Sequence, residues 1–227
     1  MYKSMLFLHW KQIKYALIPA VVASFGLPLM VVSGLGIRAA RGTPLEAYQI
    51  IGELNTWLHW FPSLASALGI LIGLSAWNWD HAHNHVYALS LPVSRFEYVL
   101  NKLLAGATLA LIPFAGMWLG AHVASAAVDL PVGLNAYPNQ LAVRFLFAML
   151  LLYGLFFALA SGTKATVLKL LTVVLVFVLL GSLGNEVLAD YYPVFERVHM
   201  VEYALRTLIE APGPFQVFSG NWALIDV

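Results

Sequence analysis

The stretch Phe145-Leu-Phe-Ala-Met-Leu-Leu-Leu-Tyr-Gly-Leu-Phe-Phe-Ala-Leu-Ala160 carries no charged residue. An α-helix needs roughly 20 apolar residues to cross the roughly 30 Å of hydrocarbon in a bilayer. The apolar segment extends over about 141–161, and Arg144, near its start, has a side chain long enough to reach the membrane interface. This segment therefore predicts a membrane-spanning helix.

Four further stretches are long and predominantly apolar, at about 15–35, 57–78, 102–127 and 166–185. Across all 227 residues, 61% are hydrophobic and 10% are charged, and the mean hydropathy is +0.80. Soluble domains contain about 25% charged residues. The sequence thus predicts an all-α, polytopic transmembrane helical bundle with five spans, organised as a single transmembrane domain, 1–227.

The first 14 residues combine basic and apolar character. Lys3, Lys11 and Lys14 alternate with apolar residues such as Leu6 and Trp10. No small-residue cleavage motif follows the apolar run, which argues against a signal peptide. We expect an interfacial helix over 1–14 that lies along the lipid headgroups before the first span.

The charges of the loops indicate the orientation. With a cytoplasmic N-terminus, the inner side has seven basic and two acidic residues, and the outer side has five basic and nine acidic residues. The inner basic residues are Lys3, Lys11, Lys14, Arg95, Lys102, Lys164 and Lys169. Cytoplasmic loops carry the excess of Lys and Arg. We therefore expect a multi-pass protein of the cell inner (cytoplasmic) membrane whose N-terminus is cytoplasmic.

This orientation places the segment 186–227 on the outer side. Apolar residues recur there at helical spacing, at Val194, Val198, Val201, Leu205 and Leu208, which predicts a short extracytoplasmic helix. The break Pro212-Gly-Pro214 follows, and Trp222–Val227 has the apolar character of the approach to a further span.

Small residues repeat every four positions in two of the spans. They are Ala65, Gly69 and Gly73 in the second span, and Gly116, Gly120 and Ala124 in the third. Such ridges let helix backbones approach closely. The pattern favours helix packing within the chain, with dimerisation as the alternative.

The inner loop Asp80–Tyr98 is the main polar break in the apolar pattern. Asp80 is suited to cap a short helix, and Pro92 would end it. The run Ser94-Arg-Phe-Glu97 is a capping box that begins the helix leading into the third span. These signals predict a rigid cytoplasmic loop that contains a short amphipathic helix.

Histidines in this loop raise the alternative of a metal site. His81 and His85 would share a helix face, but His83 would lie on the opposite face, and no matching ligand set occurs elsewhere on the inner side. We therefore expect no metal site.

Several other kinds of chemistry are disfavoured. The absence of cysteine excludes disulfides and thiol catalysis, and no Gly-x-x-x-x-Gly-Lys-[Ser/Thr] run is present to hold ATP. His59, next to aromatic Trp60, is typical of the interface, and His122 is expected to hydrogen-bond between helices. The near absence of ionisable residues within the spans disfavours an ion pathway and favours a lipid-like or amphipathic solute. No catalytic site, cofactor or nucleic-acid partner is expected.

The run Ala88-Leu-Ser-Leu-Pro-Val-Ser-Arg-Phe-Glu-Tyr-Val-Leu-Asn-Lys102 resembles the first cytoplasmic loop of type-2 ABC transporter permeases. In that family a phrase of the form L-S-L-P-V-S-R-x-x-Y-x-x-x-K follows the second span. The layout of the whole chain is similar, although the family has six spans and five are visible here.

The resemblance implies that this loop is the coupling helix, which contacts the ATPase subunit. Asp80–Leu91 would lie in a groove of that subunit, and Arg95 and Tyr98 would support the turn. The implied partner-binding residues are Asp80, His81, His85, Val86, Leu89, Leu91, Pro92, Arg95 and Tyr98.

The expected function is therefore that of the membrane permease subunit of an ABC exporter. The chain itself would not be an enzyme, because ATP and Mg²⁺ would bind to ABC ATPase subunits. A second permease copy or a related permease, together with membrane lipid, would complete the assembly. The alternatives are a non-transporting membrane anchor or assembly subunit that tethers a cytoplasmic partner, and a membrane-embedded enzyme.

Overall fold

The structure is a computed structural model that describes residues 1–40, 51–52, 56–83, 92–128, 130, 133–162, 169, 172, 207 and 212–226. The chain divides into two compact units, Met1–Phe157 with Asn221–Val227, and Ala158–Gly220. The expected fifth span, 166–185, and the expected outer helix lie outside the described residues, apart from single positions.

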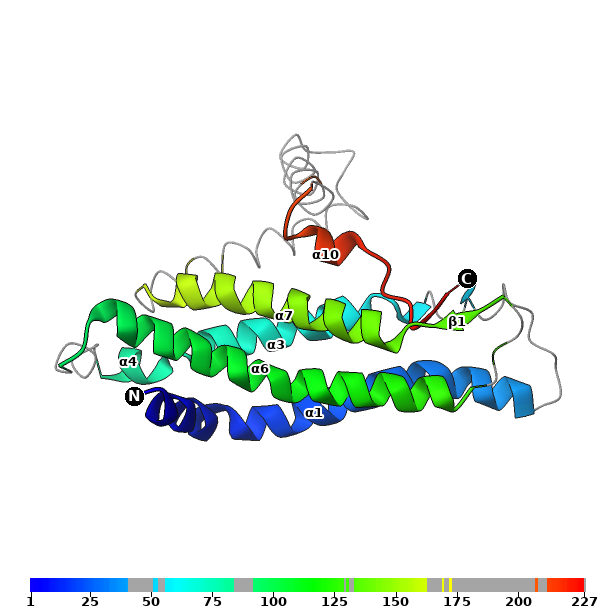
Figure 1. Ribbon diagram of the computed structural model, residues 1–227, viewed down its shortest axis with the longest axis horizontal. Helices are drawn as coiled ribbons and strands as arrows, with labels where there is room; N and C mark the ends of the chain where they lie inside the picture. Colours follow the sequence, from blue (N-terminus) through cyan, green and yellow to red (C-terminus); the bar gives the residue numbers. More distant parts are fainter. Residues whose placement is uncertain are drawn as a thin grey trace. The chain divides into compact units, whose positions relative to one another are not determined.

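Helices dominate the described part of the chain (Figure 1). Its elements are α1 (Tyr2–Ala40), α3 (Trp60–Ser75), α4 (Asn78–Ala82), α6 (Arg95–Ala126), β1 (Asn135–Ala136), α7 (Pro138–Ala160), α10 (Gln216–Ser219) and β2 (Ile225–Asp226). Within the described residues, three segments are long and apolar enough to cross a membrane: Tyr2–Ser33, Arg95–Ala126 and Pro138–Ala160. The described part is thus mostly helical and compatible with the expected transmembrane bundle, of which it contains three helices long enough to span. The second expected span corresponds to α3, an apolar helix of 16 residues.

The expected interfacial segment 1–14 and the first expected span belong to one continuous helix, α1, but this helix is bent. Tyr2 Oη and Thr108 Oγ1 on α6 are 2.6 Å apart, while Val21 faces Gly116 on α6. The two α1 positions are about 28 Å apart along a helix, whereas the two α6 positions are about 12 Å apart. The first turns of α1, dark blue in Figure 1, accordingly appear foreshortened relative to the rest of the helix. Pro19 accounts for a bend, because it cannot donate a hydrogen bond to the Tyr15 carbonyl.

The small residues noted in the sequence lie where helices of this chain meet. A Cβ added to Gly120 of α6 would collide with the Phe25 carbonyl oxygen of α1. A Cβ added to Gly73 of α3 would lie 3.0 Å from the backbone nitrogen of Phe157 on α7. The prediction that these ridges pack within the chain is confirmed, because α1 meets α6 and α3 meets α7 through them.

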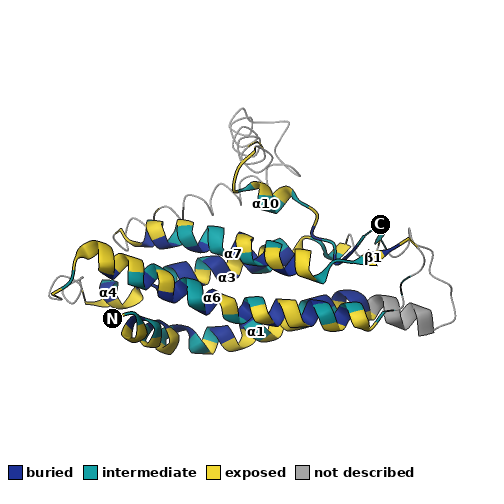
Figure 2. Cartoon of the chain, viewed as in Figure 1, coloured by how far each residue is buried: buried dark blue, intermediate teal, exposed yellow. Residues whose placement is uncertain are grey.

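The surface of these helices is strongly apolar. Figure 2 shows exposed residues along the outer sides of α1, α6 and α7, and buried residues where the helices face one another. Val22, Leu119 and Phe147 are 67%, 49% and 61% exposed, respectively. Large exposed side chains of this kind are suited to a lipid environment.

The segment that resembled the approach to a further span is extended. Ile225 and Asp226 form β2, which pairs antiparallel with β1, and the Tyr137 N–H donates to the Leu224 carbonyl at 2.8 Å. Trp222 and Ile225 are 3% and 1% exposed. The segment 222–226 is thus largely buried and paired with the loop that precedes α7.

Candidate functional site

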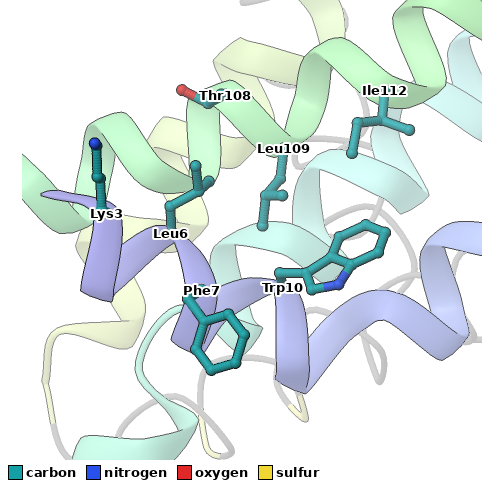
Figure 3. A pocket seen from close by; sticks show the side chains of 7 residues that line it. All are labelled: Lys3, Leu6, Phe7, Trp10, Thr108, Leu109 and Ile112. Atoms are coloured by element: carbon teal, nitrogen blue, oxygen red, sulfur yellow. The ribbon is translucent and has the colours of Figure 1, made fainter.

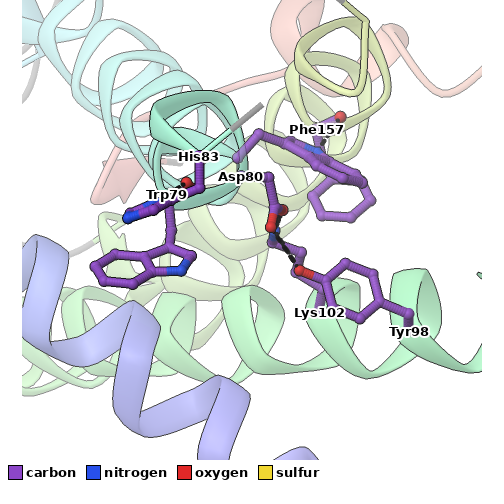
Figure 4. Close-up of polar contacts among 7 residues, drawn as sticks. Trp79, Asp80, His83, Tyr98, Lys102 and Phe157 are labelled. Carbon is purple, nitrogen blue, oxygen red and sulfur yellow. Dashed lines mark hydrogen bonds and ion pairs between the residues drawn. The ribbon is translucent and has the colours of Figure 1, made fainter. Parts of the chain in front are cut away.

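Asp80 forms a buried ionic cluster with two residues of α6. Its carboxylate is completely buried, forms an ion pair with the Lys102 ammonium and accepts a hydrogen bond from Tyr98 Oη at 2.7 Å. Lys102 and Tyr98 are 3% and 4% exposed. Figure 4 shows the carboxylate facing both partners. We call Asp80, Tyr98 and Lys102 the ionic cluster.

Trp77 connects this cluster to α7. The Lys102 ammonium lies 4.3 Å from the centroid of the Trp77 ring, within the range of a cation–π interaction. The Trp77 indole N–H donates to the Phe157 carbonyl of α7 at 2.9 Å. Tyr153, also on α7, donates its hydroxyl to the Leu103 carbonyl of α6 at 2.7 Å. The turn between α3 and α4, the start of α6 and the end of α7 are therefore linked at one place.

Asp80 has a different place from the one expected, and the rest of the expected short helix, from 84 to 91, lies outside the described residues. The helix α4 begins at Asn78, its N-cap is Trp77, and it ends at Ala82 with His83 as its C-cap. Asp80 lies inside α4, so the prediction that it caps the helix is wrong. Its carboxylate binds Lys102 and Tyr98 instead of the free backbone N–H groups at a helix start.

The expected start of the next helix is confirmed. Ser94 is the N-cap of α6, and its hydroxyl accepts a hydrogen bond from the Glu97 backbone N–H at 3.2 Å. This cap satisfies one of the N–H groups that lack partners within a helix. Arg95 is exposed and Phe96 is 74% exposed, so the first turn presents a cationic and an aromatic side chain at the surface.

The other expected partner-binding residues fall into two groups. Among the described ones, Pro92 is exposed and His81 is half-buried. The remaining ones, His85, Val86, Leu89 and Leu91, lie outside the described residues. The burial of Asp80 and Tyr98 removes both from the surface and gives them a structural place at the base of the loop.

Asp80, one of the side chains considered for a metal site, has its carboxylate bound by Lys102 and Tyr98. His83 Nδ1 lies 2.9 Å from the Trp79 carbonyl of its own helix. Within the described part of the chain, no three histidine or carboxylate side chains are gathered to hold a metal ion.

Lys102 and Trp77 are members of the site that sequence reasoning did not single out. A signal was present, because Tyr98 and Lys102 are spaced i,i+4 and therefore share a face of α6. Lys102 also ends the loop motif quoted above. The third residue of the ionic cluster, Asp80, comes into contact with Tyr98 and Lys102 because α4 packs against α6.

Polar contacts at the other end of α6 fit the sequence interpretation of His122. His122 Nε2 lies 3.0 Å from Asn139 Oδ1 of α7, and the Trp118 indole N–H donates to the same oxygen at 2.9 Å. The expectation that His122 hydrogen-bonds between helices is confirmed.

No protein-family model matches this sequence, and no curated protein or solved structure is significantly similar to it. The family resemblance therefore rests on the loop motif and the layout of the spans.

Proposed function

We propose that this chain is the membrane permease subunit of an ATP-driven exporter of the type-2 ABC class. A separate ATPase subunit would bind the loop between α4 and α6, hydrolyse ATP and move the membrane helices. A lipid-like or amphipathic substrate suits the apolar spans. The observation that carries the proposal is the ionic cluster, because it fastens both ends of this loop to the helix bundle.

A loop transmits force only if its base does not yield. Asp80 lies before the loop and Tyr98 and Lys102 lie after it, so their contacts close the base of the loop. The Trp77 contact to Phe157 extends the link to α7. A displacement of the loop would therefore act on α6 and α7 together rather than on a flexible connector.

The partner surface would include the exposed first turn of α6. Arg95 and Phe96 project from it, and aromatic and Arg side chains are the residues that most often dominate binding at interfaces. The buried Asp80 and Tyr98 would position this surface without touching the partner.

Purification of the chain from its native membrane in mild detergent tests the proposal. We expect an ATPase with a phosphate-binding P-loop to co-purify in stoichiometric amount, and Phe96 replaced by a photo-crosslinking residue to couple to it. Recovery without an ATPase would overturn the proposal.

A second experiment separates transport from tethering. In the reconstituted complex, Arg95→Ala should reduce transport per ATP hydrolysed while the complex remains assembled, and Lys11→Ala, an exposed lysine on α1, should not. If Arg95→Ala releases the ATPase and leaves transport per bound complex unchanged, the anchor alternative is favoured.

A further inference from the structure

A second feature of the described residues is an apolar groove between the bent start of α1 and the middle of α6. It has a volume of about 400 Å³ and opens to the outside of the helix pair. Figure 3 shows the side chains that line it: Lys3, Leu6, Phe7, Trp10, Thr108, Leu109 and Ile112. The volume lies within the range of small-molecule sites, about 300–1,000 Å³.

The groove exists because the first turns of α1 cross α6. The contact between Tyr2 Oη and Thr108 Oγ1, at 2.6 Å, holds the two helices together beside it. The buried Leu109 and the half-buried Ile112 and Leu6 form apolar walls. Both helices belong to segments apolar enough to span a membrane. The groove is therefore accessible to lipid from the side.

The groove is suited to an amphipathic ligand with a negative charge. Lys3 is the one charged residue among those that line the groove, and it is exposed. Trp10 is 39% exposed at the groove, and tryptophan is enriched where membranes meet water. A lysine at the edge of an apolar groove pairs favourably with a lipid phosphate.

We propose that this groove binds one anionic phospholipid, with the phosphate beside Lys3 and an acyl chain against Leu6, Leu109 and Ile112. The site is independent of the exporter assignment, since it depends on α1 and α6 alone. A bound lipid would bridge the start of α1 and α6 and stabilise the contact between them.

Native mass spectrometry of the full-length chain tests this site, with phosphatidylglycerol and phosphatidylcholine as the added lipids. We expect one phosphatidylglycerol to be retained in preference to phosphatidylcholine. Loss of the lysine charge in Lys3→Gln should weaken phosphatidylglycerol binding about fivefold, as estimated for one lysine near a lipid phosphate. Lys11→Gln, a change of an exposed lysine outside the groove, should leave binding unchanged.

Filling the groove provides the second arm. Ile112→Trp should abolish retention of the lipid, whereas Leu111→Trp, at the adjacent exposed position outside the groove, should not. If Ile112→Trp does not fold, the comparison of Lys3→Gln with Lys11→Gln decides the question. Equal retention of both lipids by the unmodified chain, or binding unaffected by Lys3→Gln, would overturn the proposal. A chain dimer that dissociates on Ile112→Trp would do the same and would make the groove a contact between copies.

Discussion

At the scale of single residues, the energetics centre on a charge pair removed from solvent. The Asp80 carboxylate and the Lys102 ammonium are almost completely buried and compensate each other. Removing one member of such a pair leaves the other charge buried without a partner, which costs more than the pair itself contributes. The stability of the fold should therefore be more sensitive to loss of one member of this pair than to loss of both.

Asp80→Asn should lower the free energy of unfolding by about 3–5 kcal/mol, because the Lys102 ammonium loses its counter-charge. Unfolding of the purified chain in detergent measures the effect. The matched control is Glu97→Gln, a change at an exposed acidic residue, which should have little effect. The double variant Asp80→Asn with Lys102→Gln should recover part of the loss. Equal stabilities of Asp80→Asn and Glu97→Gln would refute a structural role for the pair.

The two ends of the loop differ in how well the sequence predicted them. The role of Ser94 was correct because an N-cap acts within three residues, so its signal is local. The predicted cap role of Asp80 was wrong because its partner Lys102 is 22 positions away, and their contact depends on how α4 packs against α6. The local sequence favoured an N-cap role for Asp80, but the packing of α4 against α6 places its carboxylate on Lys102 instead.

At the scale of helices, the start of α6 depends on its cap. Ser94→Ala removes the acceptor for the Glu97 N–H and should lower the free energy of unfolding by about 1 kcal/mol. Hydrogen exchange at the backbone of the first α6 turn should become faster, while exchange near the α6 end should not change. Ser94→Asp keeps an acceptor and should restore protection; if it does not, the cap is not the cause.

The contact between α1 and α6 makes a second prediction at this scale. Gly120→Ala should destabilise the fold by about 1–3 kcal/mol, because the new methyl group would collide with the Phe25 carbonyl oxygen. Gly26→Ala on α1 is the control, since no atom lies within 4 Å of its added Cβ. Alanine favours helices over glycine, so Gly26→Ala should be neutral or stabilising. Thermal unfolding of both variants in detergent distinguishes the two outcomes.

At the scale of the whole molecule, the length of the apolar segments predicted the helices, whereas contacts between residues far apart in sequence determine how the helices pack. The expected spans 102–127 and 141–161 correspond closely to α6 and α7 because hydropathy accumulates within each segment. The contact of the bent α1 with α6 and the pairing of β1 with β2 both join parts of the chain that are far apart in sequence. Neither has a local signal strong enough to predict it, so the sequence did not predict that Ile225 and Asp226 would pair with β1.

The orientation of α6 tests the arrangement of the whole chain in the membrane. Its 32 residues correspond to about 48 Å of helix, which exceeds the roughly 30 Å of hydrocarbon, so both ends should lie outside the apolar layer. Arg95 and Ala127 are exposed at these ends, and the chain has no cysteine of its own. Arg95→Cys should react with a membrane-impermeant maleimide only from the cytoplasmic side, and Ala127→Cys only from the opposite side. Labelling of sealed vesicles of both orientations measures this. Reaction of both cysteines from one side would show that α6 does not cross the membrane, and the reverse pattern would invert the orientation expected from the lysines.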